Sequence, residues 1–282
     1  MKNPIFPMVS KSWLKKNLDH PKLIILDATI NKVITEDKTA VTNKIIPGAR
    51  FFDIKGMFSD KETNIPNMLP APKVFEKGCQ YLGIQQDSQI VVYDQLGIYS
   101  GPRVWWMFKT MGFDNVAVLD GGLPAWINAN YPLEDLNSYV DIKYEKGNYK
   151  AAFKPDHIVN QKGIFSIMHN PDVVILDARS HGRFIGTEPE PREDLKSGHI
   201  PGSINLPYTK VLKDGKMKSV EELKSIFTDI DLENKKLIFT CGSGITACII
   251  LLAAEIAGYS NLSVYDGSWS EWGLIDGLPI EC

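Results

Sequence analysis

The chain has 282 residues, 44% of them hydrophobic and 23% charged, an ordinary balance for a globular protein that is long enough for two domains. Its 31 Lys and Arg residues against 34 Asp and Glu residues leave a net charge of −3, so the charge does not favour nucleic acid or a membrane surface as a partner. Residues 1–20 lack the apolar core of a secretory signal, and the longest apolar run, at 247–258, has about half the length of a membrane span. We therefore expect a cytoplasmic protein with neither nucleic acid nor a membrane as a partner.

In chain order, short apolar segments alternate with helical patterns. Residues 90–93 and 116–119 have the length and apolar character of buried parallel strands, and a helix is predicted between them over 103–112. The same order returns in the second half, with two strands and an intervening helix predicted over 237–240, 262–265 and 246–258. This alternation predicts an α/β fold in which each half has a mainly parallel sheet flanked by helices, with ligands at the carboxyl ends of strands.

The two halves also resemble each other residue by residue. Residues 111–126 recur at a spacing of 146 residues, and two earlier segments recur in the same order: 111–126 as 257–272, 23–30 as 173–180 and 46–54 as 200–208. Three similar segments in one order indicate that an α/β unit has been duplicated. The charged, weakly periodic stretch 131–155 is the predicted linker. We place the boundary near residue 145, which gives domains of residues 1–145 and 146–282.

The cysteines and histidines show no pattern of a metal site. The four cysteines form no CxxC pair, and the five histidines form neither an HxxxH pattern nor a cluster with cysteines. In a reducing compartment the cysteines should be free thiols. We therefore expect no metal in this protein.

A glycine-rich loop that begins with Cys241 follows the strand predicted at 237–240. The loop, CGSGIT, leads directly into the predicted helix, and Gly242 and Gly244 permit a tight turn with backbone N–H groups pointing inward. The helix presents its positive end to the same space. Such surroundings stabilise a thiolate, which makes Cys241 the candidate nucleophile. The alternative is a buried structural cysteine, but such a cysteine has no use for a loop that binds anions.

Protein phosphatases also carry a cysteine in a loop of this kind. Their chemistry needs an arginine that closes the loop and holds phosphate by two parallel hydrogen bonds. The sixth residue after Cys241 is Ala247, and residues 241–246 contain no arginine. Phosphatase activity is therefore not expected.

Two arginines lie among acidic residues in the polar segment 181–202. Arg183 and Arg192 could together hold a planar carboxylate beside Cys241. The forked guanidinium group of arginine matches a carboxylate better than the lysine ammonium does. Surface ion pairing is the alternative interpretation, and the sequence alone leaves both open. His199, in the same segment, is interpreted as a structural turn residue rather than a base.

With these motifs, the whole chain resembles the tandem-rhodanese sulfurtransferases, in the branch of that family that uses 3-mercaptopyruvate. The matching motifs span both halves: CGSGIT, GRFIGTEPEPR, GHIPG, PRVWWMF, LDGGLPAW and YDGSWSEW. The resemblance implies two rhodanese-like domains with catalysis in the second and a persulfide on Cys241. It also implies that Arg183 and Arg192 bind the carboxylate and keto group of the substrate. Gly242, Ser243 and Gly244 match the mercaptopyruvate branch, whereas thiosulfate-using members have basic residues in this loop.

The implied reaction moves sulfur from 3-mercaptopyruvate to a thiol or cyanide acceptor and releases pyruvate. The expected partners are this small-molecule substrate and a thiol acceptor such as thioredoxin or a small thiol. No cofactor is implied, because sulfur itself is the group carried. The expected substrate-binding residues are the two arginines and the loop residues Gly242, Ser243, Gly244, Ile245 and Thr246. A thiosulfate sulfurtransferase is the alternative enzyme, and a non-catalytic docking module, which the retained Cys241 disfavours, is the alternative of another class.

The first half departs from the family pattern at two positions. The family commonly carries a histidine before Met-Leu-Pro and an acid after Phe-Phe-Asp-Ile, proposed to work with the serine of the cysteine loop. Here Asn67 and Lys55 stand at those positions, so a Ser-His-Asp relay cannot be assembled around Ser243. The first half also lacks the catalytic thiol, and a gap-free alignment of the repeats places Gln95 opposite Cys241.

Overall fold

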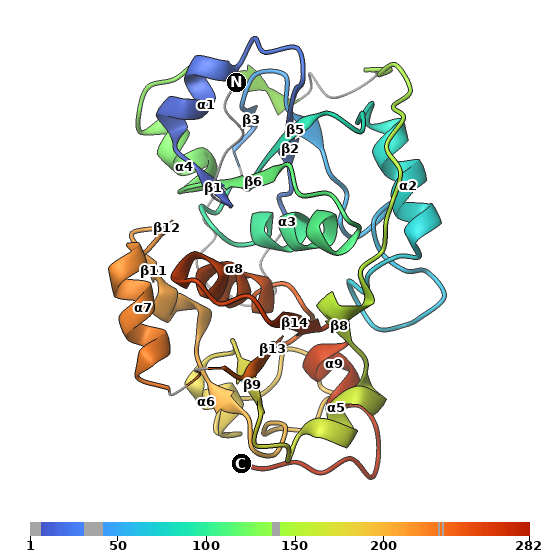
Figure 1. Cartoon of the computed structure of the whole chain (residues 1–282), viewed down its shortest axis with the longest axis vertical. Helices are drawn as coiled ribbons and strands as arrows, with labels where there is room; N and C mark the ends of the chain where they lie inside the picture. The colour runs from blue at the N-terminus through green and yellow to red at the C-terminus, as the bar shows by residue number, and fades with distance from the viewer. Residues whose placement is uncertain (1–6, 31–41, 137–141, 231, 233) are drawn as a thin grey trace. The chain divides into compact units, whose positions relative to one another are not determined.

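The structure is a computed structural model, and it describes residues 7–30, 42–136, 142–230, 232 and 234–282 (Figure 1). The chain forms two compact units. The first comprises Met1–Asp60, Leu69–Lys154 and Asp214–Lys216, and the second comprises Lys61–Met68, Pro155–Lys213 and Met217–Cys282. The short segment 61–68 therefore belongs to the second unit although it comes from the first half of the sequence.

Each unit is built on a five-stranded sheet in which all neighbouring strands run parallel. The first sheet has the order β1 (Met8–Val9), β6 (Val116–Leu119), β5 (Gln89–Tyr93), β2 (Leu23–Asp27), β4 (Arg50–Phe51). The second has the order β8 (Ile158–Val159), β14 (Leu262–Tyr265), β13 (Lys236–Thr240), β9 (Val173–Asp177), β10 (Ile204–Asn205). When the strands are renumbered in chain order within each unit, the two sheets have the same strand order. The predicted α/β class with parallel sheets is confirmed.

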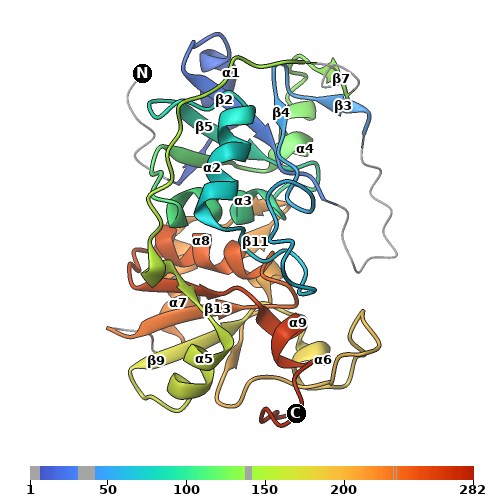
Figure 2. The same cartoon turned by 90° about the vertical axis from the view of Figure 1, so that its right-hand side faces the viewer.

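The first sheet is covered by two helices on each face. Helices α1 (Lys11–Asn17) and α4 (Gly122–Ile127) cover one face, where their side chains meet the inward-facing residues of β2, β5 and β6 in one core cluster. Helices α2 (Pro72–Tyr81) and α3 (Gly101–Thr110) cover the other face (Figures 1 and 2). That second core is aromatic, with the ring of Phe75 5.2 Å from that of Phe108. The predicted helix over 103–112 is confirmed as α3.

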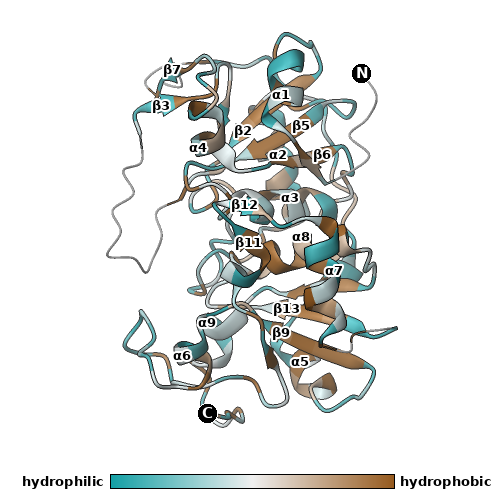
Figure 3. Cartoon of the chain, turned by 90° about the vertical axis from the view of Figure 1, so that its left-hand side faces the viewer, coloured by the Kyte–Doolittle hydropathy of each residue, from teal (hydrophilic) through white to brown (hydrophobic). Residues whose placement is uncertain are grey.

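The second sheet has the same layered arrangement. Helices α5 (Gln161–Ile167) and α9 (Ser268–Trp272) pack on one face, and α7 (Val220–Thr228) and α8 (Ala247–Ala257) lie on the other, while the short α6 (His181–Phe184) follows β9 (Figure 1). Figure 3 shows the apolar colouring gathered on the central strands of both sheets and on α8. Helix α8 is almost entirely buried and ends at Gly258, whose φ of +104° only glycine adopts without strain. The strands predicted at 237–240 and 262–265 and the helix predicted over 246–258 are confirmed as β13, β14 and α8.

The predicted linker packs along the first unit over most of its described length. Tyr149 is completely buried, its hydroxyl donates to the Met111 carbonyl at 3.2 Å, and its ring contacts Phe75 and Phe108. Residues 146–154, which the sequence prediction assigned to the second domain, therefore lie with the first unit, and the second unit resumes at Pro155.

The remaining elements are short. Two small two-stranded sheets pair β3 (Lys44–Ile45) with β7 (Glu134–Asp135) and β11 (Leu212–Lys213) with β12 (Lys216–Met217). Short 3₁₀ helices span Pro155–His157 and Tyr208–Val211. Within the described ranges, no helix has the length and apolar character needed to cross a membrane.

Candidate active site

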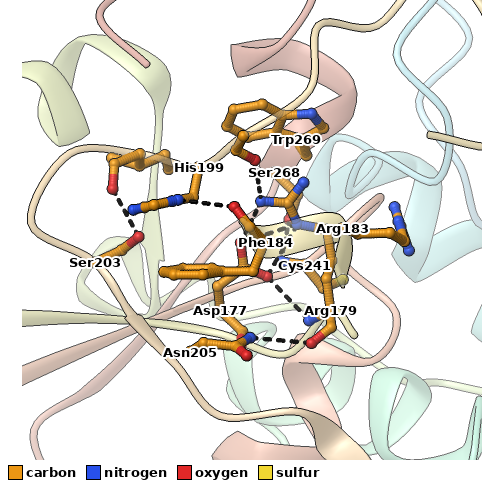
Figure 4. Close-up of polar contacts among 12 residues, drawn as sticks. Asp177, Arg179, Arg183, Phe184, His199, Ser203, Asn205, Cys241, Ser268 and Trp269 are labelled. Atoms are coloured by element: carbon orange, nitrogen blue, oxygen red, sulfur yellow. Dashed lines mark hydrogen bonds and ion pairs between the residues drawn. The ribbon is translucent and has the colours of Figure 1, made fainter. Parts of the chain in front are cut away.

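Cys241 follows the last residue of β13, a central strand of the second sheet, and α8 begins six residues later at Ala247. The carboxyl end of a parallel strand is the usual position of a functional loop in this class of fold. Cys241 is 2% exposed, and Figure 4 shows it beside Arg183, Asp177 and Ser268. The structure thus places the predicted nucleophile at the carboxyl-terminal end of the parallel strands, next to the N-terminus of α8.

The backbone on either side of the sulfur-bearing residue is tied to the start of α9. The Cys241 carbonyl accepts from the Trp269 N–H at 2.9 Å, and the Cys241 N–H donates to Ser268 Oγ at 3.3 Å. The Gly242 carbonyl accepts from the N–H and the hydroxyl of Ser270 at 2.8 and 2.7 Å. These bonds hold the first two residues of the loop in one conformation, so the position of the sulfur is set by the packing of α9.

The two glycines of the loop serve different purposes. Gly244 has a φ of +76°, in the left-handed region that favours glycine, whereas Gly242 lies outside that region. A Cβ atom at Gly242 would instead lie 3.0 Å from Nη2 of Arg183. Gly244 is therefore required by the backbone turn, and Gly242 leaves space for the guanidinium of Arg183 against the loop.

The last loop residues form the start of α8. Thr246 precedes the helix, and the carbonyls of Ile245 and Thr246 accept from Cys248 and Ile249 at 3.2 and 3.1 Å. The Cys248 thiol donates to the Gly244 carbonyl at 3.3 Å, so its buried sulfur supports the loop from behind. These bonds tie the start of α8 to the last residues of the loop that begins at Cys241.

The strand register identifies the residue of the first unit that corresponds to Cys241. Tyr93 pairs with Asp27 in the first sheet, and Thr240 pairs with Asp177 in the second, where Asp27 and Asp177 are equivalent residues of the repeated segment. The pairing of β5 with β6 and of β13 with β14 leads to the same correspondence. Tyr93 therefore corresponds to Thr240.

Asp94, rather than Gln95, occupies the position of Cys241. The gap-free alignment was wrong by one residue because the loop before α3 is one residue longer than the loop before α8. Both strands end immediately before Asp94 and Cys241, respectively, whereas the helices begin at Gly101 and Ala247. The extra residue lies inside the loop, where the sequence carries no signal for its place.

The Asp94 carboxylate lies in a cradle of backbone N–H groups. It is completely buried and accepts four hydrogen bonds of 2.9 to 3.0 Å from the N–H groups of Leu96, Tyr99, Ser100 and Gly101. Burial raises the pKa of Asp94, and the backbone hydrogen bonds oppose that shift without cancelling it. In this loop, at the N-terminus of α3, the backbone N–H groups therefore bind the Asp94 carboxylate at the position where the second unit carries the Cys241 thiol.

Arg183 is held in place by a buried ion-pair network. Its Nε donates to Glu190 at 3.2 Å, and its Nη2 forms a second bond to the same carboxylate. Glu190 also accepts from Arg179 at 2.8 Å. Arg179 in turn pairs with Asp177 and stacks on Trp269 at 4.3 Å (Figure 4). Two guanidinium groups and two carboxylates balance in charge. Nη1 of Arg183 has no hydrogen-bond partner among the described residues and is the nitrogen left for a ligand.

Arg192 has a different environment. Its Nε and Nη2 donate to Asp194 at 3.1 and 2.6 Å, and the two side chains are 36% and 52% exposed. This contact is the surface ion pair of the alternative interpretation. Of the two arginines, Arg183 has its guanidinium against Gly242 of the Cys241 loop, whereas the Arg192 guanidinium is bonded to the exposed Asp194.

His199 supports α6 in the manner expected of a structural residue. Its ring stacks on Phe184 with 3.7 Å between centroids, and its Nδ1 lies 2.8 Å from the Phe184 carbonyl. Within the ranges described, no group of three or more His, Cys, Asp or Glu residues is arranged to hold a metal ion.

Ser243 has a partner from the segment 61–68. Nδ2 of Asn67 lies 3.0 Å from Ser243 Oγ and 3.4 Å from the Ser243 carbonyl oxygen. Both residues belong to the second unit. Asn67, which stands at a position where the sequence departs from the family pattern, thus contacts the loop serine directly through its side-chain amide.

Sequence reasoning missed Asp94, Asp177, Arg179 and Glu190. Asp94 follows the strand predicted at 90–93, and Asp177 comes after four apolar residues inside the repeated segment 173–180, so their place at the carboxyl edge of a sheet was a usable signal. Glu190 had none, because an acidic residue in a polar loop is usually solvated and only the fold shows that its side chain is 1% exposed.

The comparisons with known proteins agree with this arrangement. The sequence model described as the rhodanese-like domain matches residues 10–129 and 165–274. The chain is 38% identical over 277 residues to the 3-mercaptopyruvate sulfurtransferase of Escherichia coli K12, covering 97% of both chains. It is also 38% identical over 276 residues to the mouse thiosulfate sulfurtransferase, covering 94% of this chain and 91% of that one. The crystal structure of SseA from Escherichia coli, described as a 3-mercaptopyruvate sulfotransferase with the rhodanese fold, matches with a TM-score of 0.81 and 35% identity over 94% of this chain and 100% of that one.

Proposed function

The chain belongs to the rhodanese family of sulfurtransferases, and from this premise we propose that it takes sulfur from 3-mercaptopyruvate, carries it as a persulfide on Cys241 and releases pyruvate. The observation that carries the proposal is the correspondence of Cys241 with Asp94. The loop of the first unit holds a carboxylate through four N–H groups, so the related loop of the second unit is suited to a thiolate and a persulfide anion.

The proposed reaction has two displacements. The Cys241 thiolate attacks the sulfur of 3-mercaptopyruvate, an S–S bond forms, the C–S bond breaks, and its electron pair leaves on pyruvate as the enolate. The proton of the substrate thiol ends on the enolate carbon, which gives pyruvate and the Cys241 persulfide anion. An acceptor thiol or cyanide then takes the outer sulfur and regenerates the thiolate. Sulfur is the group carried, so the cycle needs no cofactor.

Arg183 is the proposed anchor of the substrate carboxylate. Glu190 fixes its guanidinium, Nη1 remains available, and the group lies against Gly242 beside the nucleophile. A guanidinium held in this way donates to a carboxylate without first having to be ordered. Arg192 is proposed as a second contact, and it must leave Asp194 to serve in that role.

The residues of the loop favour 3-mercaptopyruvate over thiosulfate. Gly242, Ser243, Gly244, Ile245 and Thr246 contribute N–H groups and two hydroxyls but no cation. Thiosulfate is a dianion that gains most from positive charge beside the attacked sulfur, whereas 3-mercaptopyruvate carries its charge at the far end of its carbon skeleton. The name of the Escherichia coli relative supports the same choice, and that of the mouse relative makes thiosulfate the donor to compare.

The remaining parts of the proposal concern the context of the reaction. We place the reaction in the cytoplasm and take the acceptor to be thioredoxin or a small thiol. The second unit, which contains Cys241, is proposed as catalytic, and the first as a unit without a catalytic cysteine.

The experiment that tests the proposed function compares kcat/KM for 3-mercaptopyruvate and thiosulfate in one preparation, with pyruvate release and sulfite release as the readouts. We expect 3-mercaptopyruvate to be preferred at least tenfold, about 1.4 kcal/mol of differential transition-state binding. The Cys241→Ser variant should be inactive with both donors, and Cys282→Ser, which alters an exposed thiol, is the matched control. A preference for thiosulfate would reject the proposed donor, and activity in Cys241→Ser would reject the proposed nucleophile.

A further inference from the structure

Asn67 lies in a turn whose backbone itself favours asparagine. Its φ of +61° is in the left-handed region, which asparagine adopts more readily than most residues. Pro66 precedes it, and a proline followed by a residue with positive φ is the pattern of a type II turn. The turn and the Cys241 loop belong to the same compact unit, so the contact between them is internal to that unit.

The contact between Asn67 and Ser243 has a defined direction. The Asn67 amide faces two oxygens of Ser243, the hydroxyl at 3.0 Å and the carbonyl at 3.4 Å. A carbonyl oxygen only accepts hydrogen bonds, so the amide nitrogen, and not the amide oxygen, must face the serine. The hydroxyl oxygen of Ser243 is consequently an acceptor in this bond, and its own proton points away from Asn67.

We propose that Asn67 is a positioning residue that keeps Ser243 as a fixed hydrogen-bond donor to the substrate oxygen that becomes negative when the C–S bond breaks. This inference rests on the proposed function. Ser243 is two residues from the nucleophile on the same loop, and its side chain is only half-buried. The sequence of the loop supplies no other hydroxyl before Thr246.

The chemistry of an amide sets the role of the serine. A histidine, which the family commonly carries at this position, can accept the serine proton, but the Nδ2 group of asparagine has no basic lone pair. As the Cys241 thiolate takes the sulfur, the electron pair of the C–S bond passes to the enolate oxygen of the leaving pyruvate. Ser243 stabilises that oxygen and keeps its own proton throughout. The proton that reaches the enolate carbon comes from the substrate thiol.

Two substitutions of Asn67 separate its backbone role from its amide. Asn67→Gly tolerates the left-handed φ but deletes the amide, so the serine hydroxyl is no longer held in one direction. Asn67→Asp keeps the shape of the side chain and also tolerates the left-handed φ. Its carboxylate, however, accepts a hydrogen bond from the Ser243 hydroxyl, which turns that hydroxyl away from the substrate. We expect Asn67→Gly to lower the rate of the first turnover roughly three- to tenfold. Asn67→Asp should lower it further than Asn67→Gly does.

The test combines these variants with Ser243→Ala in a double-mutant cycle. Pyruvate formed in the first turnover, without an acceptor and with 3-mercaptopyruvate at saturation, reports the step in which the enolate forms. Ser243→Ala should slow this step roughly ten- to a hundredfold, and Asn67→Gly should then have no further effect beyond a factor of about two. KM should change little in all variants, because the hydrogen bond strengthens in the transition state rather than on binding.

The outcomes are separable. If Asn67→Gly lowered the first-turnover rate by the same factor in the wild type and in Ser243→Ala, the inference would be overturned. An Asn67→Asp variant as fast as the wild type would also overturn it. Losses confined to KM would also overturn it. A wild-type protein that releases no pyruvate would instead reject the proposed function, and in that case Asn67 would still contact Ser243 without a reaction to support.

Discussion

Glu190 holds two guanidinium groups, and Glu190→Gln therefore tests how strongly the buried network supports the site. The carboxylate accepts from Arg179 at 2.8 Å and from Arg183 Nε at 3.2 Å, and the side chain is 1% exposed. Glutamine keeps the size but removes the negative charge and turns an N–H donor toward a guanidinium. Breaking a buried pair by removing one partner costs about 3–5 kcal/mol. We expect a loss near the lower bound, about 3 kcal/mol in the free energy of unfolding, because glutamine retains one acceptor oxygen.

Asp194→Asn is the matched control, because it removes the partner of Arg192 in an exposed pair. An ion pair of this kind contributes at most about 1 kcal/mol. Urea unfolding followed by tryptophan fluorescence gives both free energies, and first-turnover rates report the effect on Arg183. Two variants that agree in stability within about 0.5 kcal/mol would refute the reasoning, since burial would then make no difference.

The remaining predictions concern the substrate, the loop and the first unit. Arg183→Lys should lower kcat/KM for 3-mercaptopyruvate roughly ten- to a hundredfold, because lysine keeps the charge but cannot bond Glu190 and a carboxylate together; steady-state kinetics within twofold of the wild type would return Arg183 to a structural role. Gly242→Arg with Ser243→Lys should shift the ratio of kcat/KM values toward thiosulfate at least tenfold, since the φ of Gly242 permits a side chain and only the end of Arg183 must move; an unchanged ratio would place donor choice outside this loop. Because the pKa of Asp94 is raised, the folded state binds its proton more tightly than the unfolded state does. This group therefore contributes stability below the ordinary aspartate pKa of about 3.9. That contribution is lost as the pH rises through the pKa of the folded state. Urea unfolding across that pH range should therefore show the wild type losing stability relative to Asp94→Asn as pH rises, and parallel curves would contradict the assignment.

The architecture was predictable because its elements carry strong local patterns. The strands at 90–93 and 237–240 are continuous apolar runs, as buried parallel strands require, and glycine-containing loops separate them from the following helices. The place of Cys241 at the end of such a strand followed from the same pattern. The linker was less predictable, because Tyr149 is one of five aromatic residues in a charged stretch and its burial depends on the packing of α2 and α3.

The details of the site depended on contacts that no local pattern encodes. A gap-free alignment cannot locate one extra residue inside a loop, so Asp94 was hidden behind Gln95 until strand pairing identified it. Arg183 and Arg192 are nine residues apart in the same polar segment, yet one is held by a buried glutamate and the other by an exposed aspartate. The difference between them is set by burial, which the sequence of a polar loop does not reveal.

The most direct test of the central claim is the mass of the protein after reaction with 3-mercaptopyruvate in the absence of an acceptor. The account predicts a gain of one sulfur atom, located on the peptide that contains Cys241, with one pyruvate released per sulfur bound and the added sulfur lost again when a thiol is supplied. Pyruvate released without a sulfur on Cys241, or a sulfur found on Cys79, Cys248 or Cys282 instead, would contradict it.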